Sequence, residues 1–225
     1  MYPIRHGHSY MKNYEIAVRR ALVHLSGKSF WDVGANTGYY TFMLAKNFDR
    51  VTAFEPNPAA ADILRRKSTV RRLTNIRVVP VALSDSQGTS KLFLYSKIRE
   101  RSIGSRNSLM TAPVGAGTVL HEPNRSTSPP FVEVETNTVD NILGTEAVDL
   151  MKIDVEGAEF LVLRGARDAL TDGRIKSLVI ELHDWKRKGE LDALLTEYRY
   201  RTTWLDFAPE SPTNHVLAIL EKSSS

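Results

Sequence analysis

The sequence predicts an α/β fold in which a mostly parallel β-sheet carries helices on both faces. Three observations support this prediction. Apolar runs typical of buried strands recur along the chain, and they alternate with segments whose apolar residues have helical spacing. The first run ends in a glycine-rich turn. The chain has 225 residues, 42% of them hydrophobic, and no cysteine, which suits one sizeable core without disulfides. A single domain over residues 1–225 is therefore expected.

The predicted elements begin with an N-terminal helical cap in residues 1–28, because apolar residues at positions 10–26 have helical spacing. Five apolar runs indicate strands, at residues 29–33, 51–54, 76–82, 148–153 and 177–182. Asn57 and Pro58 supply an N-cap and a first-turn proline for the helix after the second run. Since helical stretches separate most of the runs, parallel strands with right-handed crossovers are expected.

Segments of a different kind follow the third run. Residues 90–95 and 131–136 alternate apolar and polar side chains, which indicates half-exposed strands on either side of a long insertion at residues 97–130. Insertions of this length are usually functional or disordered, so this one is interpreted as a substrate lid, with a mobile surface excursion as the alternative. Residues 200–207 and 215–220 predict two strands of a closing antiparallel hairpin.

The glycine-rich turn after the first run marks the predicted ligand site. The sequence DVGANTGYY places Gly34 and Gly38 in this turn, and Glu55 ends the second run about 20 residues later. Glycines let the backbone approach a ligand closely, and a carboxylate at this offset accepts hydrogen bonds from ribose hydroxyls. The spacing differs from the G-x-G-x-x-G of dinucleotide enzymes, and the G-x-x-x-x-G-K-S/T phosphate loop is absent. A nucleoside without phosphates is therefore expected, most commonly S-adenosylmethionine.

Several sequence blocks occur in a characteristic order. They are DVGANTGYYT from residue 32, FEPN from residue 54, VALSD from residue 81, VD from residue 139 and MKIDVEGAE from residue 151. Together they resemble the FkbM-type methyltransferases over residues 29–185, and the last block is the most specific. The resemblance implies a Rossmann-like class I methyltransferase fold with a mostly parallel seven-stranded sheet and a C-terminal antiparallel hairpin.

The resemblance also implies which residues hold the cofactor. In open parallel sheets, ligands bind beyond the carboxyl ends of the strands, where the strand order reverses. Asp32 is expected at the cofactor ammonium group and Glu55 at its ribose. Ala82 and Leu83 are expected beside adenine, with core packing as the alternative, and Asn57 has helix capping as its alternative role. The expected cofactor-binding residues are Asp32, Gly34, Asn36, Gly38, Glu55, Asn57, Ala82 and Leu83.

A second group of ionisable residues is predicted at the ends of the two later strands. Lys152 and Asp154 share one face of their strand because side chains alternate, and a buried lysine needs a partner or a cavity. Glu156 and Glu159 follow at the start of a helix, where capping is the alternative role for both.

The last run repeats this arrangement. Glu181 and His183 lie two residues apart on one face, whereas the other histidines, His215 included, have no comparable context. Histidine suits a general base because its ordinary pKa of about 6.5 lies near working pH. His183, oriented by Glu181, is therefore the expected base, with Lys152 or a water held by Asp154 as alternatives. The predicted catalytic set is His183, Asp154, Glu181, Lys152 and Glu156. A divalent metal held by Asp154, Glu156 and Glu181 is possible, since hard cations prefer oxygen ligands, but it is not favoured, and no metal ligand is assigned.

The expected activity is transfer of a methyl group from S-adenosylmethionine to a hydroxyl of a small molecule, a sugar or a glycolipid-type acceptor. RNA 2′-O-methylation is the rival, since the pI is near 9.3 and Lys152, Asp154 and Glu181 are the residue types of a ribose-methylating site. A non-catalytic S-adenosylmethionine-binding module is the other alternative. The basic residues are dispersed in small clusters, so nucleic acid is not the expected partner. No apolar run approaches the roughly 18 residues of a membrane helix, and a cytoplasmic protein without a membrane span is expected.

Overall fold

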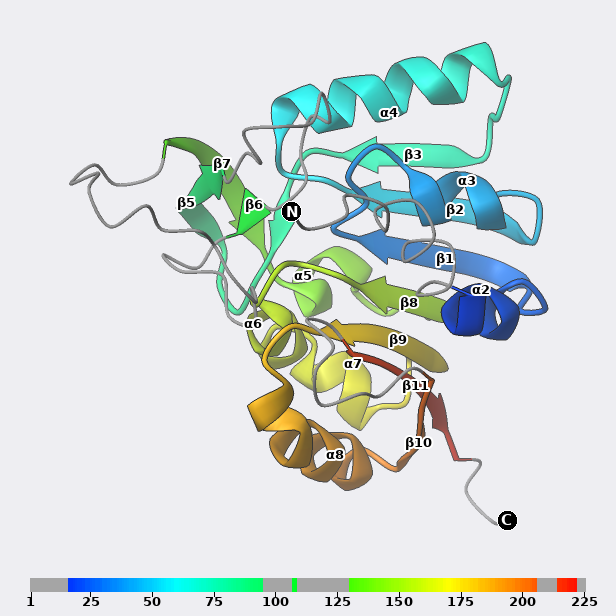
Figure 1. Ribbon diagram of the computed structural model, residues 1–225, viewed down its shortest axis with the longest axis vertical. Coiled ribbons are helices and arrows are strands. Elements are labelled where there is room, and N and C mark those ends of the chain that lie inside the picture. Colours follow the sequence, from blue (N-terminus) through cyan, green and yellow to red (C-terminus); the bar gives the residue numbers. More distant parts are fainter. Residues whose placement is uncertain (1–15, 95–106, 109–129, 206–213, 222–225) are drawn as a thin grey trace, which may run out of the picture.

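The central sheet has seven strands in the order β10-β11-β9-β8-β1-β2-β3, and all of them except β11 run parallel to the first (Figure 1). The computed structural model describes residues 16–94, 107–108, 130–205 and 214–221. The strands are β1 (Gly27–Val33), β2 (Phe48–Phe54), β3 (Ile76–Val79), β8 (Leu150–Ile153), β9 (Ser177–Leu182), β10 (Tyr200–Trp204) and β11 (Asn214–Leu220). The predicted fold class is confirmed.

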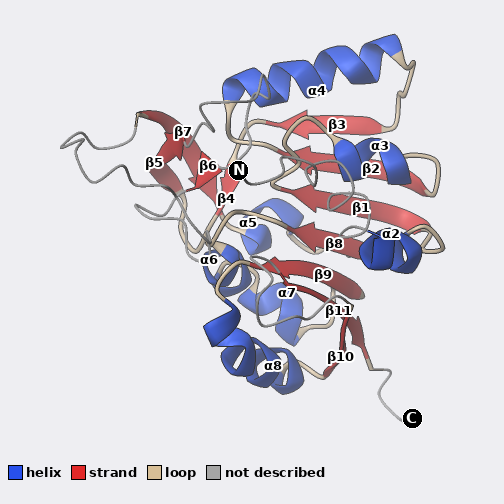
Figure 2. Cartoon of the chain, in the orientation of Figure 1, coloured by secondary structure: helices blue, strands red, loops and turns tan. Residues whose placement is uncertain are grey.

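Helices cover both faces of this sheet (Figure 2). One face carries α2 (Ile16–Leu22), α3 (Tyr39–Leu44) and α4 (Pro58–Val70). The other face carries α5 (Val139–Leu143), α6 (Glu159–Arg164), α7 (Arg167–Thr171) and α8 (Lys188–Glu197), which the 3₁₀-helix η1 (Trp185–Arg187) precedes. Because side chains alternate along a strand, each face has its own apolar core. Phe30 packs with Leu22 and Leu44 on the first face, and Met151 packs with Phe160 on the second.

A second, smaller sheet lies beyond the carboxyl ends of β1, β2 and β3 (Figure 1). Its strands are β4 (Ala82–Leu83), β7 (Phe131–Asn137), β5 (Gly88–Leu94) and β6 (Asn107–Ser108), in the order β4-β7-β5-β6. The prediction of one strand over 76–82 is wrong, because β3 ends at Val79 and Ala82 belongs to the second sheet. Pro80 lacks the N–H that a continuing strand would need. The two half-exposed strands are confirmed as β5 and β7, which pair antiparallel. Apart from β6 and Pro130, the insertion lies outside the described residues.

The C-terminal strands close the sheet as predicted. β11 pairs antiparallel with both β10 and β9, so it lies between them. Of the predicted N-terminal helical cap, the described part is α2, which packs over Phe30. Among the residues that the structure describes, no helix has the length and apolar character needed to cross a membrane.

Candidate active site

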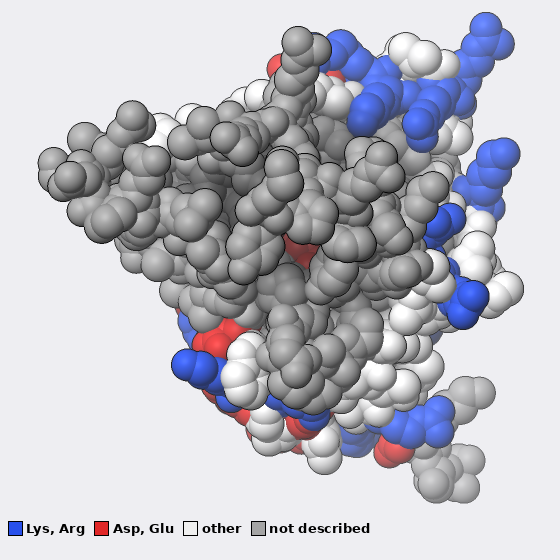
Figure 3. All heavy atoms as spheres, in the orientation of Figure 1, with Lys and Arg blue, Asp and Glu red and all other residues white. Residues whose placement is uncertain are grey.

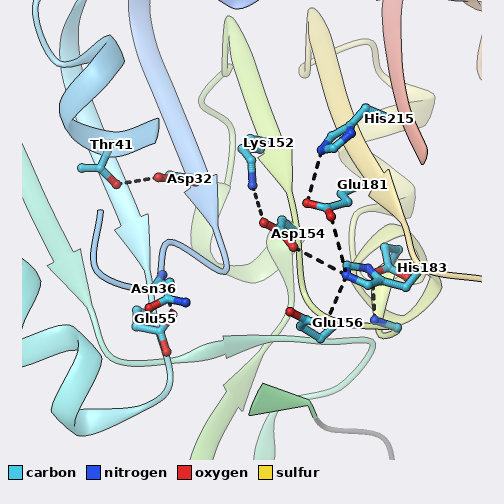
Figure 4. A network of polar contacts seen from close by, with 12 residues as sticks. Asp32, Asn36, Thr41, Glu55, Lys152, Asp154, Glu156, Glu181, His183 and His215 are labelled. Atoms are coloured by element: carbon cyan, nitrogen blue, oxygen red, sulfur yellow. Dashed lines mark hydrogen bonds and ion pairs between the residues drawn. The ribbon is translucent and has the colours of Figure 1, made fainter. Parts of the chain in front are cut away.

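Ionisable side chains from four neighbouring strands lie on one face of the central sheet, the face that α2 and α3 cover (Figure 4). They are Asp32 in β1, Lys152 in β8, Glu181 in β9 and His215 in β11. Asp32 is the direct register partner of Lys152, and Glu181 is that of His215. The alternation of side chains therefore gathers four charged or titratable groups into one row.

A cavity adjoins this row at the carboxyl ends of β1, β2 and β8. Its lining residues are Val33, Gly34, Asn36, Phe54, Glu55, Pro56, Val81, Ala82, Leu83, Leu92, Asp154, Val155 and Glu156. Five of the eight predicted cofactor residues belong to this lining, and Asp32, Gly38 and Asn57 do not. Of the predicted catalytic residues, Asp154 and Glu156 belong to it. The cavity thus joins the glycine turn to the end of β8.

The glycine turn is locked against the end of β8. Gly34 has a φ of +79°, and a Cβ added there would lie 1.8 Å from the carbonyl oxygen of Asp154. Gly38 has a φ of +91°, and a Cβ there would lie 2.5 Å from the ring of Phe42. Both positions therefore require glycine. Asn36, between them, has a φ of 50°.

Glu55 is held at the cavity by the backbone around it. Its Oε2 accepts a hydrogen bond from Asn36 N at 2.7 Å, and its Oε1 accepts one from Asn57 N at 2.8 Å. Burial raises the pKa of Glu55 to about 7, although the two backbone hydrogen bonds act in the opposite direction. Asn57 also caps α4, since its side chain accepts from Ala59 N at 3.0 Å and Pro58 stands at the first helical position. The predicted capping of α4 is confirmed.

Asp32 lies behind the glycine turn and is buried. Thr41 Oγ1 donates to its Oδ2 at 2.5 Å, and its Oδ1 has no hydrogen-bond partner within the described part of the chain. Burial raises the pKa of Asp32, against the lowering effect of the Lys152 charge. Asp32 therefore contacts the start of α3 and faces Lys152, and its predicted contact with a cofactor ammonium group stays a prediction.

Lys152 is fully buried and has the partner that its position in a strand demands. Its Nζ lies 2.8 Å from Asp154 Oδ2 and 4.6 Å from the centroid of the Tyr40 ring. Burial alone would lower the pKa of Lys152, but the charges of Asp154, Asp32 and Glu181 outweigh that effect and raise it. Lys152 is therefore a cation that links the glycine turn to the end of β8.

His183 lies outside the cavity lining, and Figure 4 shows it beside Glu156. Its Nδ1 is 2.8 Å from Glu159 Oε1, and its Nε2 is 3.2 Å from Glu156 Oε2. Burial alone would lower the pKa of His183, but these two hydrogen bonds raise it well above 6.5. The expectation that Glu181 orients His183 is corrected here, because Glu181 Oε1 is 3.9 Å from Nε2 and Glu159 holds Nδ1.

Glu159 and Glu156 owe their positions to the sharp turn between β8 and α6. Gly157, at a φ of +102°, donates its N–H to Glu159 Oε1 at 2.8 Å. Glu159 is the first residue of α6, and its buried side chain points at the sheet instead of solvent. Glu156 has a φ of 54°, a conformation that is uncommon without glycine and clusters at functional sites. The turn therefore places one carboxylate on each nitrogen of His183.

His215 is a site residue that the sequence reasoning missed. Its Nε2 lies 3.2 Å from Glu181 Oε2, and the residue is 2% exposed. Burial alone would raise the pKa of Glu181, but the hydrogen bond and charge of His215 outweigh it and lower that pKa. The sequence does contain a signal for this residue, because His215 is polar and stands at the start of an otherwise apolar run. In the structure that run is β11, and it pairs with β9, which ends near Glu181.

Asp154 completes the cluster. Its Oδ1 lies 3.9 Å from His183 Nε2, and its pKa is raised by burial and by the charge of Glu181. Asp154, Glu156 and His183 each offer one ligand atom within 4.8 Å of the others, a spacing at which a metal ion fits. The cluster also has cations of its own, because Lys152 Nζ and the His183 imidazole face the same carboxylates.

The strand order, the glycine turn and the cavity at the carboxyl ends of the strands define a Rossmann-like class I methyltransferase. A family model described as the Methyltransferase FkbM domain matches residues 32–202. The chain belongs to this family and is a methyltransferase enzyme.

Relatives agree with this assignment. The chain is 32% identical over 186 residues to the 31-O-demethyl-FK506 methyltransferase FkbM of Streptomyces tacrolimicus, covering 75% of this chain and 71% of that protein. It is 27% identical over 192 residues to the methyltransferase sdnD of Sordaria araneosa, covering 76% and 73%. It is 26% identical over 175 residues to the hexuronic acid methyltransferase AglP of Haloferax volcanii, covering 76% and 63%.

Solved structures share the fold. A methyltransferase FkbM from Methylobacillus flagellatus superposes with a TM-score of 0.61 at 18% identity, over 92% of this chain and 47% of that one. A Streptococcus mutans protein in complex with SAH has a TM-score of 0.52 at 12% identity, over 90% and 94%.

Proposed function

We propose that this enzyme transfers a methyl group from S-adenosylmethionine to a hydroxyl group of a small molecule, a sugar or a glycolipid-type acceptor. The observation that carries the proposal is that Glu55, Asp154 and Glu156 line one and the same cavity. Glu55 would bind the nucleoside at one end, and Asp154 and Glu156 would accept a proton at the other. Two relatives support a hydroxyl-bearing acceptor by their names, one a 31-O-demethyl-FK506 methyltransferase and the other a hexuronic acid methyltransferase.

The residues of the cavity suit a nucleoside without phosphates. The two oxygens of Glu55, fixed by backbone donors, retain lone pairs for a pair of ribose hydroxyls. Ala82 and Leu83 form an apolar wall for adenine. The Oδ1 of Asp32, which has no hydrogen-bond partner among the described residues, suits an ammonium group near the glycine turn. S-adenosylmethionine bound here would supply an electrophilic methyl group on sulfur.

Proton handling falls to Glu156 and His183. The acceptor hydroxyl must lose its proton as the new bond forms, and a base contributes roughly 10²–10⁴-fold to such a step. Glu156 lines the cavity and touches His183 Nε2, while Glu159 fixes Nδ1, so the hydroxyl proton passes to the Glu156–His183 pair.

The RNA alternative lacks support at the cavity. Its described lining contains Glu55, Asp154 and Glu156 and no lysine or arginine, and carboxylates repel phosphates. Basic side chains instead gather over α4 (Figure 3), where Arg71 follows the C-terminal end of the helix. That end lies about 20 Å from the cavity end of α4, since a helix rises 1.5 Å per residue.

The test is acceptor-dependent release of S-adenosylhomocysteine. We expect hydroxyl-bearing acceptors such as hexuronic acids and 31-O-demethyl-FK506 to stimulate release, and a Glu55→Ala variant to lose cofactor affinity in calorimetry. Binding of S-adenosylmethionine without release on any hydroxyl acceptor would favour the non-catalytic module. Release of S-adenosylhomocysteine that requires RNA, and that falls steeply as the salt concentration rises, would favour the RNA methyltransferase.

A further inference from the structure

The C-terminal hairpin delivers a histidine to the middle of the ionisable cluster. His215 is the second residue of β11, and its register partner on β9 is Glu181. Its Nε2 lies 3.2 Å from Glu181 Oε2, and the side chain is 2% exposed. This contact joins β11, the last described strand of the chain, to the end of β9. Glu181 precedes His215 by 34 residues in the sequence.

Glu181 divides its two oxygens between two histidines. Oε2 faces His215, while Oε1 lies 3.9 Å from Nε2 of His183. The other charged groups that face Glu181 are Lys152 in β8 and Asp154, the residue that follows β8. Since the two oxygens of a carboxylate are equivalent, the contact of one oxygen with His215 fixes the plane of the group and so directs the other oxygen at His183 (Figure 4).

The same contact keeps Glu181 ionised. Burial favours the protonated form of a carboxylic acid, and His215 supplies the strongest of the effects that oppose it. The resulting negative charge raises the pKa of Asp154 and contributes to the raised pKa of His183. The proton affinity at the cavity therefore depends on a residue that does not line it.

We propose that His215 is a positioning residue for methyl transfer, which holds Glu181 with Oε1 turned towards His183. The proposal rests on the proposed function for its kinetic consequence. His215 lies outside the cavity lining, so its loss changes turnover and leaves cofactor binding intact. A residue that only stabilised the hairpin would lower the stability of the fold and leave the pH profile of turnover unchanged.

The kinetic experiment is a double-mutant cycle with His215→Phe, Glu181→Gln and the double variant. We expect His215→Phe to lower kcat about tenfold, the effect of roughly one pKa unit at the base, with KM for S-adenosylmethionine within about twofold of wild type. In the Glu181→Gln background the same substitution should have no further effect on kcat, because the carboxylate through which His215 acts is already removed. His215→Gln, which keeps a donor near the position of Nε2, should restore most of kcat. Ile219→Ala, elsewhere on β11 and partly exposed, is the matched control and should match wild type.

A second readout needs no acceptor. Ring-proton NMR titration of the ligand-free protein follows His183 directly, and its pKa should fall in His215→Phe and return towards wild type in His215→Gln. An unchanged His183 titration, or an effect on kcat that adds fully to that of Glu181→Gln, overturns the proposal. Failure of the proposed function looks different, because then the wild-type protein itself releases no S-adenosylhomocysteine, while the His183 titration still decides whether His215 acts through Glu181.

Discussion

Glu159 Oε1 lies 2.8 Å from Nδ1 of His183 and, at the same time, 2.8 Å from the backbone N–H of Gly157. One buried oxygen therefore fixes both the ring of His183 and the turn that presents Glu156 to the cavity. Because Nδ1 is held, Nε2 has to face the carboxylates at the end of β8.

Replacing Glu159 by glutamine should impair turnover more than binding. The amide keeps the shape but loses the charge that raises the pKa of His183, and a carboxylate that orients a catalytic imidazole matters greatly for rate. We expect kcat to fall by about 10²-fold, within the range for general-base catalysis, with cofactor affinity within about threefold of wild type. Steady-state kinetics and calorimetry measure the two effects. Glu197→Gln, at an exposed position on α8, is the control. A Glu159→Gln protein with wild-type kcat would remove His183 from the proposed mechanism.

Cofactor affinity should rise with pH through the range in which Glu55 ionises. Its pKa is raised to about 7, and the carboxylate accepts hydrogen bonds from ribose better than the acid does. Calorimetry with S-adenosylhomocysteine should show an increase in affinity of about tenfold between pH 6 and pH 8. The Glu55→Gln variant should bind weakly and without this dependence. An equally steep dependence in that variant would assign the titration to another group.

The same raised pKa predicts a change in stability with the opposite sign. The folded protein holds a proton on Glu55 at pH values where the unfolded chain has already released it. This contribution is fully present below the ordinary pKa of 4.5 and is lost as pH rises through about 7. Denaturant unfolding of the ligand-free protein should show a decline over this interval that is smaller in Glu55→Gln. If the two proteins have the same pH dependence, Glu55 is not the buried acid that the structure describes.

The local structure around Glu55 was predictable from sequence because its parts are close together in the chain. Asn57 caps the helix that begins at Pro58, and Glu55 receives its hydrogen bonds from backbone groups of the motif itself. The signal for the end of β3 was also local, since Pro80 stands inside the apolar run that was interpreted as one strand.

The cluster of ionisable residues was predictable only in part, because its decisive contacts are between distant segments. Strand alternation correctly places Lys152 near Asp154, two residues away. The contact of Glu159 with His183 spans 24 residues and depends on the angle between α6 and β9, which no local pattern determines. His215 reaches Glu181 only because β11 inserts next to β9, so its role required the strand order.

Substituting alanine for Gly34 should destabilise the fold and abolish cofactor binding together. The new Cβ would overlap the carbonyl oxygen of Asp154, and the φ of +79° is unfavourable for any residue with a side chain. Strain of this kind costs on the order of 1–3 kcal/mol, and the overlap adds to it. Gly189→Ala is the matched control, since Gly189 lies in α8 with open space around it, and alanine there should raise stability by up to about 1 kcal/mol. Thermal unfolding compares the two, and equal stabilities would contradict the close packing of the turn on β8.

Removing the charge of Lys152 should be far more costly than removing a similar charge at the surface. A Lys152→Met protein keeps the volume but leaves Asp154 and Asp32 without their cation in a buried site, and breaking such a pair costs about 3–5 kcal/mol. Lys188→Met breaks the partly exposed pair with Asp192, whose atoms are 2.6 Å apart, and should cost less than about 1 kcal/mol. Denaturant unfolding at pH 7 measures both free energies. Because protonation relieves unpaired carboxylates, lowering the pH towards 5 should recover part of the stability of Lys152→Met and none of that of Lys188→Met. A Lys152→Met protein as stable as wild type would show that the row of ionisable groups does not depend on this cation.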